Sequence, residues 1–114
     1  MARLRADLWV SAYVRRQNDV GHMCVVSRRG DPVAGQIWVS VDHLDGTHSL
    51  YVPASSASRS SDDQSHLFEI RYDRQPADKV NDRIALEGEF DPDLWVVSLD
   101  LRAGDPNLDF AKAG

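Results

Sequence analysis

The sequence predicts a single α+β domain over residues 1–114, with a mainly antiparallel sheet of about five strands and two helices, in the order α-β-β-β-β-α-β. Three observations lead to this class. The length of 114 residues is close to that of a typical single domain. Segments with alternating apolar residues flank Asp45-Gly46, a dipeptide typical of tight β-hairpin turns. Helical periodicity occurs in two longer stretches.

Residues 4–17 (LRADLWVSAYVRRQ) predict the first helix. Their apolar residues alternate as in a strand, but they also contain a helical stripe, formed by Leu8, Trp9, Ala12 and Tyr13. Two features favour the helix. Arg15 and Arg16 would complement the dipole at its C-terminal end, and Gly21 can end it.

Five segments predict strands, and the second helix precedes the last of them. The first four strands are expected at residues 22–28, 36–43, 48–53 and 66–72. The second helix is expected at residues 76–90, with Pro76 in its first turn and one apolar face formed by Ala77, Val80 and Ile84. The fifth strand is expected within residues 91–101, with one face formed by Trp95, Val97, Leu99 and Leu101.

A two-residue turn at Asp45-Gly46 predicts the register of the central hairpin. It pairs His43 with His48, Val41 with Leu50 and Val39 with Val52. One face of the hairpin is then aliphatic, with Ile37, Val39, Val41, Leu50 and Val52. The other face carries Trp38, Ser40, Asp42, Ser49 and Tyr51.

Three segments predict irregular structure. Residues 54–65 are rich in serine and predict a mobile loop, and residues 102–114 predict an irregular tail. Residues 28–35 (RRGDPVAG) predict a turn, because Gly30 and Gly35 permit unusual backbone angles and Pro32 fixes φ. Their two arginines, Arg28 and Arg29, are also candidates for binding a phosphate or carboxylate.

Composition limits the function classes. The net charge of −5 disfavours nucleic acid as the principal partner. A membrane is disfavoured as well, because no apolar run approaches the roughly 20 residues of a spanning helix. The N-terminal residues do not resemble a secretory signal, and the only cysteine, Cys24, excludes an internal disulfide. The chain is therefore expected to be cytoplasmic.

No catalytic constellation is evident. His43 and His48 face one another in the predicted hairpin, but a metal site needs at least a third protein ligand, and none is obvious. Cys24 lies in an apolar run, where a buried and inert thiol is expected. The sequence therefore favours a protein without enzymatic activity, and we expect no cofactor.

Four stretches together resemble a known family. They are LWVSAYVRR near the N-terminus, VVSRRGDPVAGQIWVSV, a hairpin ending in DGT, and FDPDLWVV. Their order is similar to that in DUF1491, a small alphaproteobacterial family of unknown function. The resemblance spans residues 4 to about 100 and excludes the serine-rich loop and the tail. It implies a short cytoplasmic α+β domain with no assigned activity and no assigned site residues.

The function hypothesis that the sequence favours is a protein-interaction or self-associating module, such as a homodimer. Five strands about 4.8 Å apart make a sheet roughly 24 Å wide, and two helices about 10 Å in diameter cover one such face. The aliphatic hairpin face is expected to take that cover. Trp38 and Tyr51 would then lie on the open face and form a contact surface, since such aromatic residues dominate interface energies.

Two alternatives compete with this surface. The tail, through Leu108 and Phe110, is long enough to cover the two aromatic rings, or the rings are half-exposed without a partner. As a different class of function, the chain is a small-molecule or anion binder, or an enzyme, that uses Arg28, Arg29 or the pair of histidines.

Overall fold

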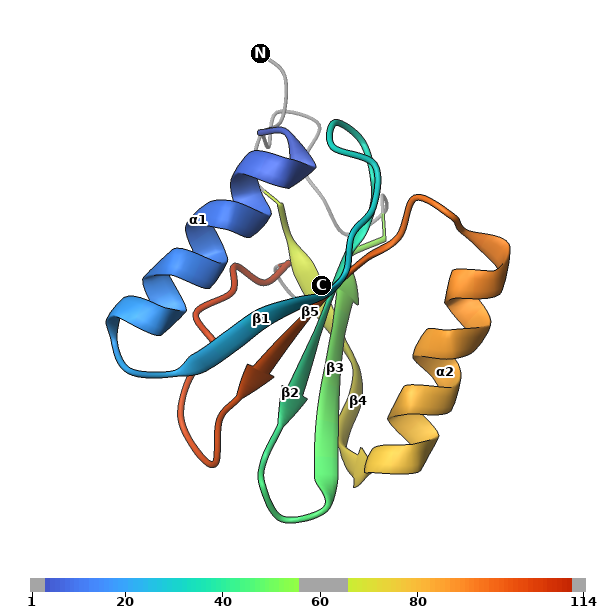
Figure 1. Cartoon of the computed structure of the whole chain (residues 1–114). Coiled ribbons are helices and arrows are strands. Elements are labelled where there is room, and N and C mark those ends of the chain that lie inside the picture. The colour runs from blue at the N-terminus through green and yellow to red at the C-terminus, as the bar shows by residue number, and fades with distance from the viewer. Residues whose placement is uncertain (1–3, 56–65, 112–114) are drawn as a thin grey trace.

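The computed structural model describes residues 4–55 and 66–111, and it confirms the predicted α+β class and order of elements. A five-stranded sheet lies between two helices (Figure 1). The elements are α1 (Ala6–Asp19), β1 (Met23–Arg28), β2 (Ile37–Asp42), β3 (Thr47–Pro53), β4 (Phe68–Pro76), α2 (Ala77–Phe90) and β5 (Trp95–Asp100). Within the described residues, no helix is long and apolar enough to cross a bilayer.

The strands are ordered β1-β5-β2-β3-β4 across the sheet. Three of the four neighbouring pairs are antiparallel, and the pair of β2 and β5 is parallel. The last strand of the chain is thus inserted between the first two. This position explains the uninterrupted apolar run Trp95-Val96-Val97, which is buried on both sides of the sheet.

The two helices cover opposite faces of the sheet, so the expectation that both cover one face is wrong. α1 packs over a core that includes Val39, Val97 and Leu99. α2 packs over a separate core that includes Trp38 and Leu50. The physical reason is that the central strands β2 and β5 are apolar on both faces, and each apolar face needs a cover.

The observed register of the β2–β3 hairpin differs by one residue from the predicted one. Asp42 pairs with His48, Val41 with Ser49 and Val39 with Tyr51. The connecting loop is longer than two residues, because the His43 N–H donates to the Thr47 carbonyl over 3.1 Å. Positive φ angles occur at Leu44 (62°) and Gly46 (89°), so Asp45-Gly46 does not form the predicted turn.

The slip exchanges the faces of every β3 side chain. One face now combines Ile37, Val39, Val41, Ser49 and Tyr51, and the other combines Trp38, Ser40, Leu50 and Val52. Carboxylates in the loop support the observed turn. Asp42 accepts a hydrogen bond from the Leu44 N–H, and Asp45 accepts from both the backbone and the hydroxyl of Thr47.

α1 forms where predicted, but it buries a different stripe. Its buried residues follow helical spacing: Ala6, Val10, Tyr13 and Gln17. Of the predicted stripe, Leu8 and Ala12 are exposed and Trp9 is only partly buried. The helix ends just before Gly21, as expected. Gly21 has a φ of 92°, and the next N–H, that of His22, donates to the Gln17 carbonyl over 3.0 Å.

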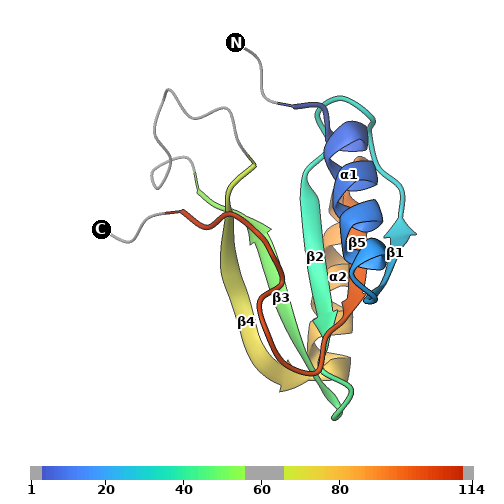
Figure 2. The same ribbon diagram turned by 90° about the vertical axis from the view of Figure 1, so that its left-hand side faces the viewer.

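The C-terminal tail is irregular as predicted, but it is packed rather than loose. It crosses the α1 side of β3 and β4 (Figure 2). The Tyr13 hydroxyl donates to the Pro106 carbonyl over 2.6 Å, and Leu108 is buried. Residues 109–111 pair with Phe68 at the outer edge of β4. Of the loop predicted at 54–65, residues 56–65 lie outside the described part of the chain.

Candidate functional site

The RRGDPVAG segment is a turn that holds the start of α1, as the turn prediction required. The Asp31 carboxylate accepts hydrogen bonds from the Val33 and Ala34 N–H groups over 3.1 and 2.8 Å. The carbonyls of Pro32 and Val33 accept from the first N–H groups of α1, those of Asp7 and Ala6. The turn therefore satisfies donors that a helix N-terminus leaves without partners.

The two arginines of this segment are occupied by the fold. The Arg28 guanidinium donates to the Gly88 and Leu94 carbonyls over 3.3 and 3.1 Å. It thereby joins the C-terminal end of α2 to the start of β5, where a positive charge complements the helix dipole. The guanidinium of Arg29 lies 5.5 Å from the centre of the Trp95 ring. Neither contact favours the predicted anion site.

The predicted histidine pair does not form. His43 is buried, and its Nδ1 donates to the Leu101 carbonyl over 2.9 Å while its Nε2 lies 2.8 Å from the Ser49 hydroxyl. His48 pairs with Asp42 instead, with 3.6 Å between Nε2 and the carboxylate. Because the register has slipped, the two imidazoles lie on opposite faces of the hairpin. The described residues contain no group of three potential metal ligands.

The predicted aromatic surface is not formed either. Trp38 is only 4% exposed, beneath α2, and its Nε1 donates to the Gln36 side chain over 2.9 Å. Tyr51 lies on the other face of the sheet, half-buried, with its ring centre 5.6 Å from that of Phe110. The tail therefore covers Tyr51, one of the two rings that the alternative expected it to cover, whereas α2 covers Trp38. The two rings do not share a surface.

The structure exposes a different apolar surface, at the edge strand β1, which the sequence reasoning missed. Met23 and Val25 are 63% and 49% exposed. Val26 and the preceding Val20 are exposed as well. α2 packs mainly against β3 and β4 and leaves this edge open (Figure 1). We call these four residues (Val20, Met23, Val25 and Val26) the β1 edge patch.

A side chain of α1 already contacts the outer backbone of β1. The Asn18 amide donates to the Cys24 carbonyl over 3.0 Å and accepts from the Cys24 N–H over 3.1 Å. The backbone of Cys24 therefore points away from β5, toward the open side of the strand. Backbone groups alternate in direction along a strand, so those of Val26 also point outward.

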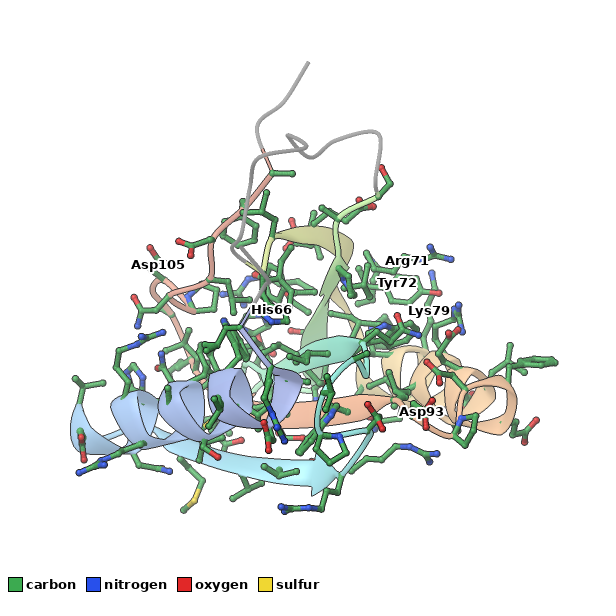
Figure 3. The ribbon with its side chains drawn as sticks, turned by 90° about the horizontal axis from the view of Figure 1, so that it is seen from above. His66, Arg71, Tyr72, Lys79, Asp93 and Asp105 are labelled. Atoms are coloured by element: carbon green, nitrogen blue, oxygen red, sulfur yellow. The ribbon has the colours of Figure 1, made fainter. Side chains whose placement is uncertain are left out.

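The opposite edge, β4, has more of the features that protect a strand edge than β1, whose ladder has one register shift, between Val26 and Arg28. It carries charges of both signs: Glu69, Arg71, Asp73 and Arg74. Arg71 extends from this strand in Figure 3. The ladder to β3 has two register shifts, and the strand ends at Pro76. Each of these features discourages pairing with another strand. Between Val20 and Ser27, by contrast, the sequence has no Lys, Arg, Asp or Glu, and this uncharged run was the available signal.

A hollow of about 410 Å³ lies at the other end of the molecule, where β2 begins and β3 ends. Its walls are mostly apolar and include Leu4, Val33, Ile37, Pro53 and Phe68. The imidazole of His66, labelled in Figure 3, lines it as well, and its Nε2 is 2.7 Å from the Leu4 carbonyl. No cluster of charged groups converges on this hollow among its described lining residues.

These features define a class: a small α+β domain with a mixed five-stranded sheet, one helix on each face and one edge strand with an exposed, uncharged stretch. The chain belongs to the DUF1491 family of proteins of unknown function, whose family model matches residues 4–109. The resemblance seen in the sequence is therefore confirmed. No curated protein matches the chain.

Solved structures share this architecture. A DUF1491 family protein from Caulobacter crescentus CB15, known from a crystal structure, is 28% identical, with a TM-score of 0.76 over 94% of this chain and 95% of that one. Protein Atu0922 from A. tumefaciens, solved in solution, is 29% identical, with a TM-score of 0.81 over 98% of both chains. An NMR structure of a Caulobacter crescentus DUF1491 protein is 27% identical, with a TM-score of 0.77 over 99% of this chain and 100% of that one.

Proposed function

We propose that this protein is a non-catalytic interaction module that binds another polypeptide chain through the β1 edge. The observation that carries the proposal is the β1 edge patch, which is exposed, apolar and within a stretch that has no charged residue from Val20 to Ser27. It replaces the Trp38 and Tyr51 surface, whose residues are buried or covered.

An edge strand of this kind has two means of binding. Its outward N–H and C=O groups can extend the sheet by one strand, and its apolar side chains lose contact with water when a partner covers them. Natural sheets usually protect such edges with charges, prolines or bulges, as β4 does here. On β1 the register shift and Arg28 lie at the end of the strand, and the stretch Met23–Val26 has no such feature. A partner strand on this stretch is therefore the best explanation for its exposure.

The alternative class, a small-molecule or anion binder, has less support. Arg28 binds two backbone carbonyls, and His43 is enclosed between Leu101 and Ser49. These groups stabilise the fold and are not aimed at a common cavity. The described residues offer no other arrangement typical of catalysis.

The proposed module acts in the cytoplasm, with a protein rather than nucleic acid or a membrane as its partner. The net charge of −5 supports the absence of a general attraction for polyanions. The lone cysteine, Cys24, is buried, and burial raises the pKa of its thiol to about 11. Such a thiol is unreactive, so the module needs no oxidising compartment and no disulfide.

The proposal is tested by comparing three baits in cell extract: the wild-type chain, Val25→Lys and Ile70→Lys. Both substitutions place a lysine at a half-exposed apolar position of an edge strand, since Ile70 on β4 is 47% exposed. A partner that binds the wild type and Ile70→Lys should lose at least about tenfold in affinity for Val25→Lys, measured with purified components. If all three baits bind the same proteins equally, the β1 edge is not the contact surface.

A further inference from the structure

We infer that the partner of the β1 edge is a second copy of this chain, paired antiparallel through β1 about a two-fold axis at Val25. This inference rests on the proposed function and names the occupant of that surface. The result is a dimer with one continuous sheet, in which the two β1 strands lie at the centre.

The directions of the backbone groups limit the possible registers. Cys24 and Val26 point outward, as the Asn18 contacts to Cys24 show. In an antiparallel pair, outward groups must meet outward groups. Pairing Cys24 with Val26 meets this condition and centres the contact on the apolar stretch. Cys24 of one copy then lies opposite Val26 of the other, and Val25 lies opposite itself on the two-fold axis.

The segment is complementary to itself in this arrangement. Met23 would face Ser27, and no charge faces a like charge between residues 23 and 27. A two-fold axis pairs the same uncharged stretch of both copies and closes the assembly at two chains.

The size of the edge predicts a weak dimer. The six residues of β1 span about 20 Å, and the strand together with the flank of α1 presents a height of roughly 20 Å. The β1 edge therefore offers a contact area of roughly 400 Å². This is about half of the surface area that each partner buries in a standard stable interface. Association should therefore appear only at high protein concentration.

Asn18 competes with the second copy for Cys24. Its amide makes the same two hydrogen bonds that a partner strand would make, one to the N–H and one to the carbonyl. No described side chain does the same for Val26. Asn18 must turn away before the strands pair, so removing its amide should strengthen the dimer.

The test is sedimentation velocity on the full chain from about 10 μM to about 1 mM, with four proteins: wild type, Val25→Lys, Ile70→Lys and Asn18→Ala. Wild type and Ile70→Lys should dimerise with equal dissociation constants. Val25→Lys should weaken the dimer by at least about tenfold, because two lysines then meet on the axis. Asn18→Ala should lower the dissociation constant by roughly tenfold, since the competing hydrogen bonds are gone. Exchange of the Val26 amide should slow as the dimer forms.

Two results would overturn the inference. One is a wild type and an Asn18→Ala variant that are both monomeric over the whole range. The other is a Val25→Lys variant that dimerises as well as the wild type. If the chain is monomeric but Val25→Lys still loses a purified partner that Ile70→Lys keeps, self-pairing is wrong and the β1 edge binds a different protein. If no partner distinguishes the two variants either, the proposed function fails as well.

Discussion

Replacing Gly30 by alanine tests how tightly the RRGDPVAG turn packs against the start of β5. A Cβ atom at residue 30 would lie 2.1 Å from the Asp93 carbonyl oxygen and 2.6 Å from Cδ1 of Trp95. Real Cβ atoms do not approach so closely, so the turn and the start of β5 must separate by more than an ångström. Neither neighbour can yield easily, because one is backbone and the other is a buried ring.

The expected loss of stability follows from what this separation breaks. The Asp31 N–H donates to the Asp93 carbonyl over 3.1 Å, and Trp95 Nε1 donates to the Asp31 carbonyl over 2.7 Å. Two such hydrogen bonds contribute about 2 kcal/mol, and forcing an extra carbon into a packed site costs about 1–3 kcal/mol. We therefore expect Gly30→Ala to lower the free energy of unfolding by about 3–5 kcal/mol, a large share of the roughly 5–15 kcal/mol of a typical domain.

The assay is equilibrium unfolding in urea, followed by tryptophan fluorescence. Gly88→Ala is the matched control, because its added Cβ would lie 2.9 Å from the Arg28 guanidinium, the far end of a flexible side chain that can shift, whereas the neighbours of Gly30 are backbone and a buried ring. Helix propensity favours alanine there by about 1 kcal/mol, so the control should stay within about 1 kcal/mol of wild type. The packing argument is refuted if Gly30→Ala and Gly88→Ala unfold with the same free energy.

Three further predictions concern buried polar groups. Tyr13→Phe should destabilise the fold by about 1–2 kcal/mol, measured by urea unfolding, because the Pro106 carbonyl loses its 2.6 Å donor. Burial raises the pKa of Cys24 from about 9 to about 11. The buried neutral thiol therefore contributes its full share to the free energy of unfolding below pH 9, and this share is lost as the pH rises to 11. The free energy of unfolding in urea should therefore fall by about 2 kcal/mol over that interval. The fall should be smaller in Cys24→Ala. A thiol reagent at pH 8 should modify Cys24 only at the rate of unfolding. His43→Ala should cost about 2–4 kcal/mol, since it leaves the Leu101 carbonyl without its donor and the Ser49 hydroxyl without one of its two partners. Its control is Ser27→Ala, which removes a hydrogen bond to Ser98 at the surface.

The elements of the fold were predictable from the sequence, because each has strong local signals. Alternation marks the strands, and Gly21 ends α1 through its positive φ. Which face of each element is buried was less predictable, because burial depends on contacts with distant parts of the chain. Gln17 is buried in α1 because His22 and the Pro106 carbonyl lie beside its amide. The sequence around residue 17 has no pattern that predicts these two partners.

The candidate site was not predictable, because an edge is a property of topology. The uncharged run from Val20 to Ser27 is visible in the sequence, but such a run is equally typical of a central strand. Its meaning depends on β5, which inserts between β1 and β2 and leaves β1 with a neighbour on one side only. Consecutive strands usually pair, and this chain departs from that tendency at β1 and β2.

The hairpin shows why apolar patterning alone can select the wrong register. The patterning argument assumes that one face of the sheet is buried and the other is open, so that a slip of one residue moves apolar side chains into water. Here both faces are covered, and Leu50 and Val52 are as well buried beneath α2 as they would be beneath α1. Burial therefore discriminates poorly between the two registers, and polar contacts decide. In the observed register Ser49 reaches the enclosed His43, and Asp42 and Asp45 each bind the backbone of the loop. A hairpin between two cores is thus positioned by its few polar residues.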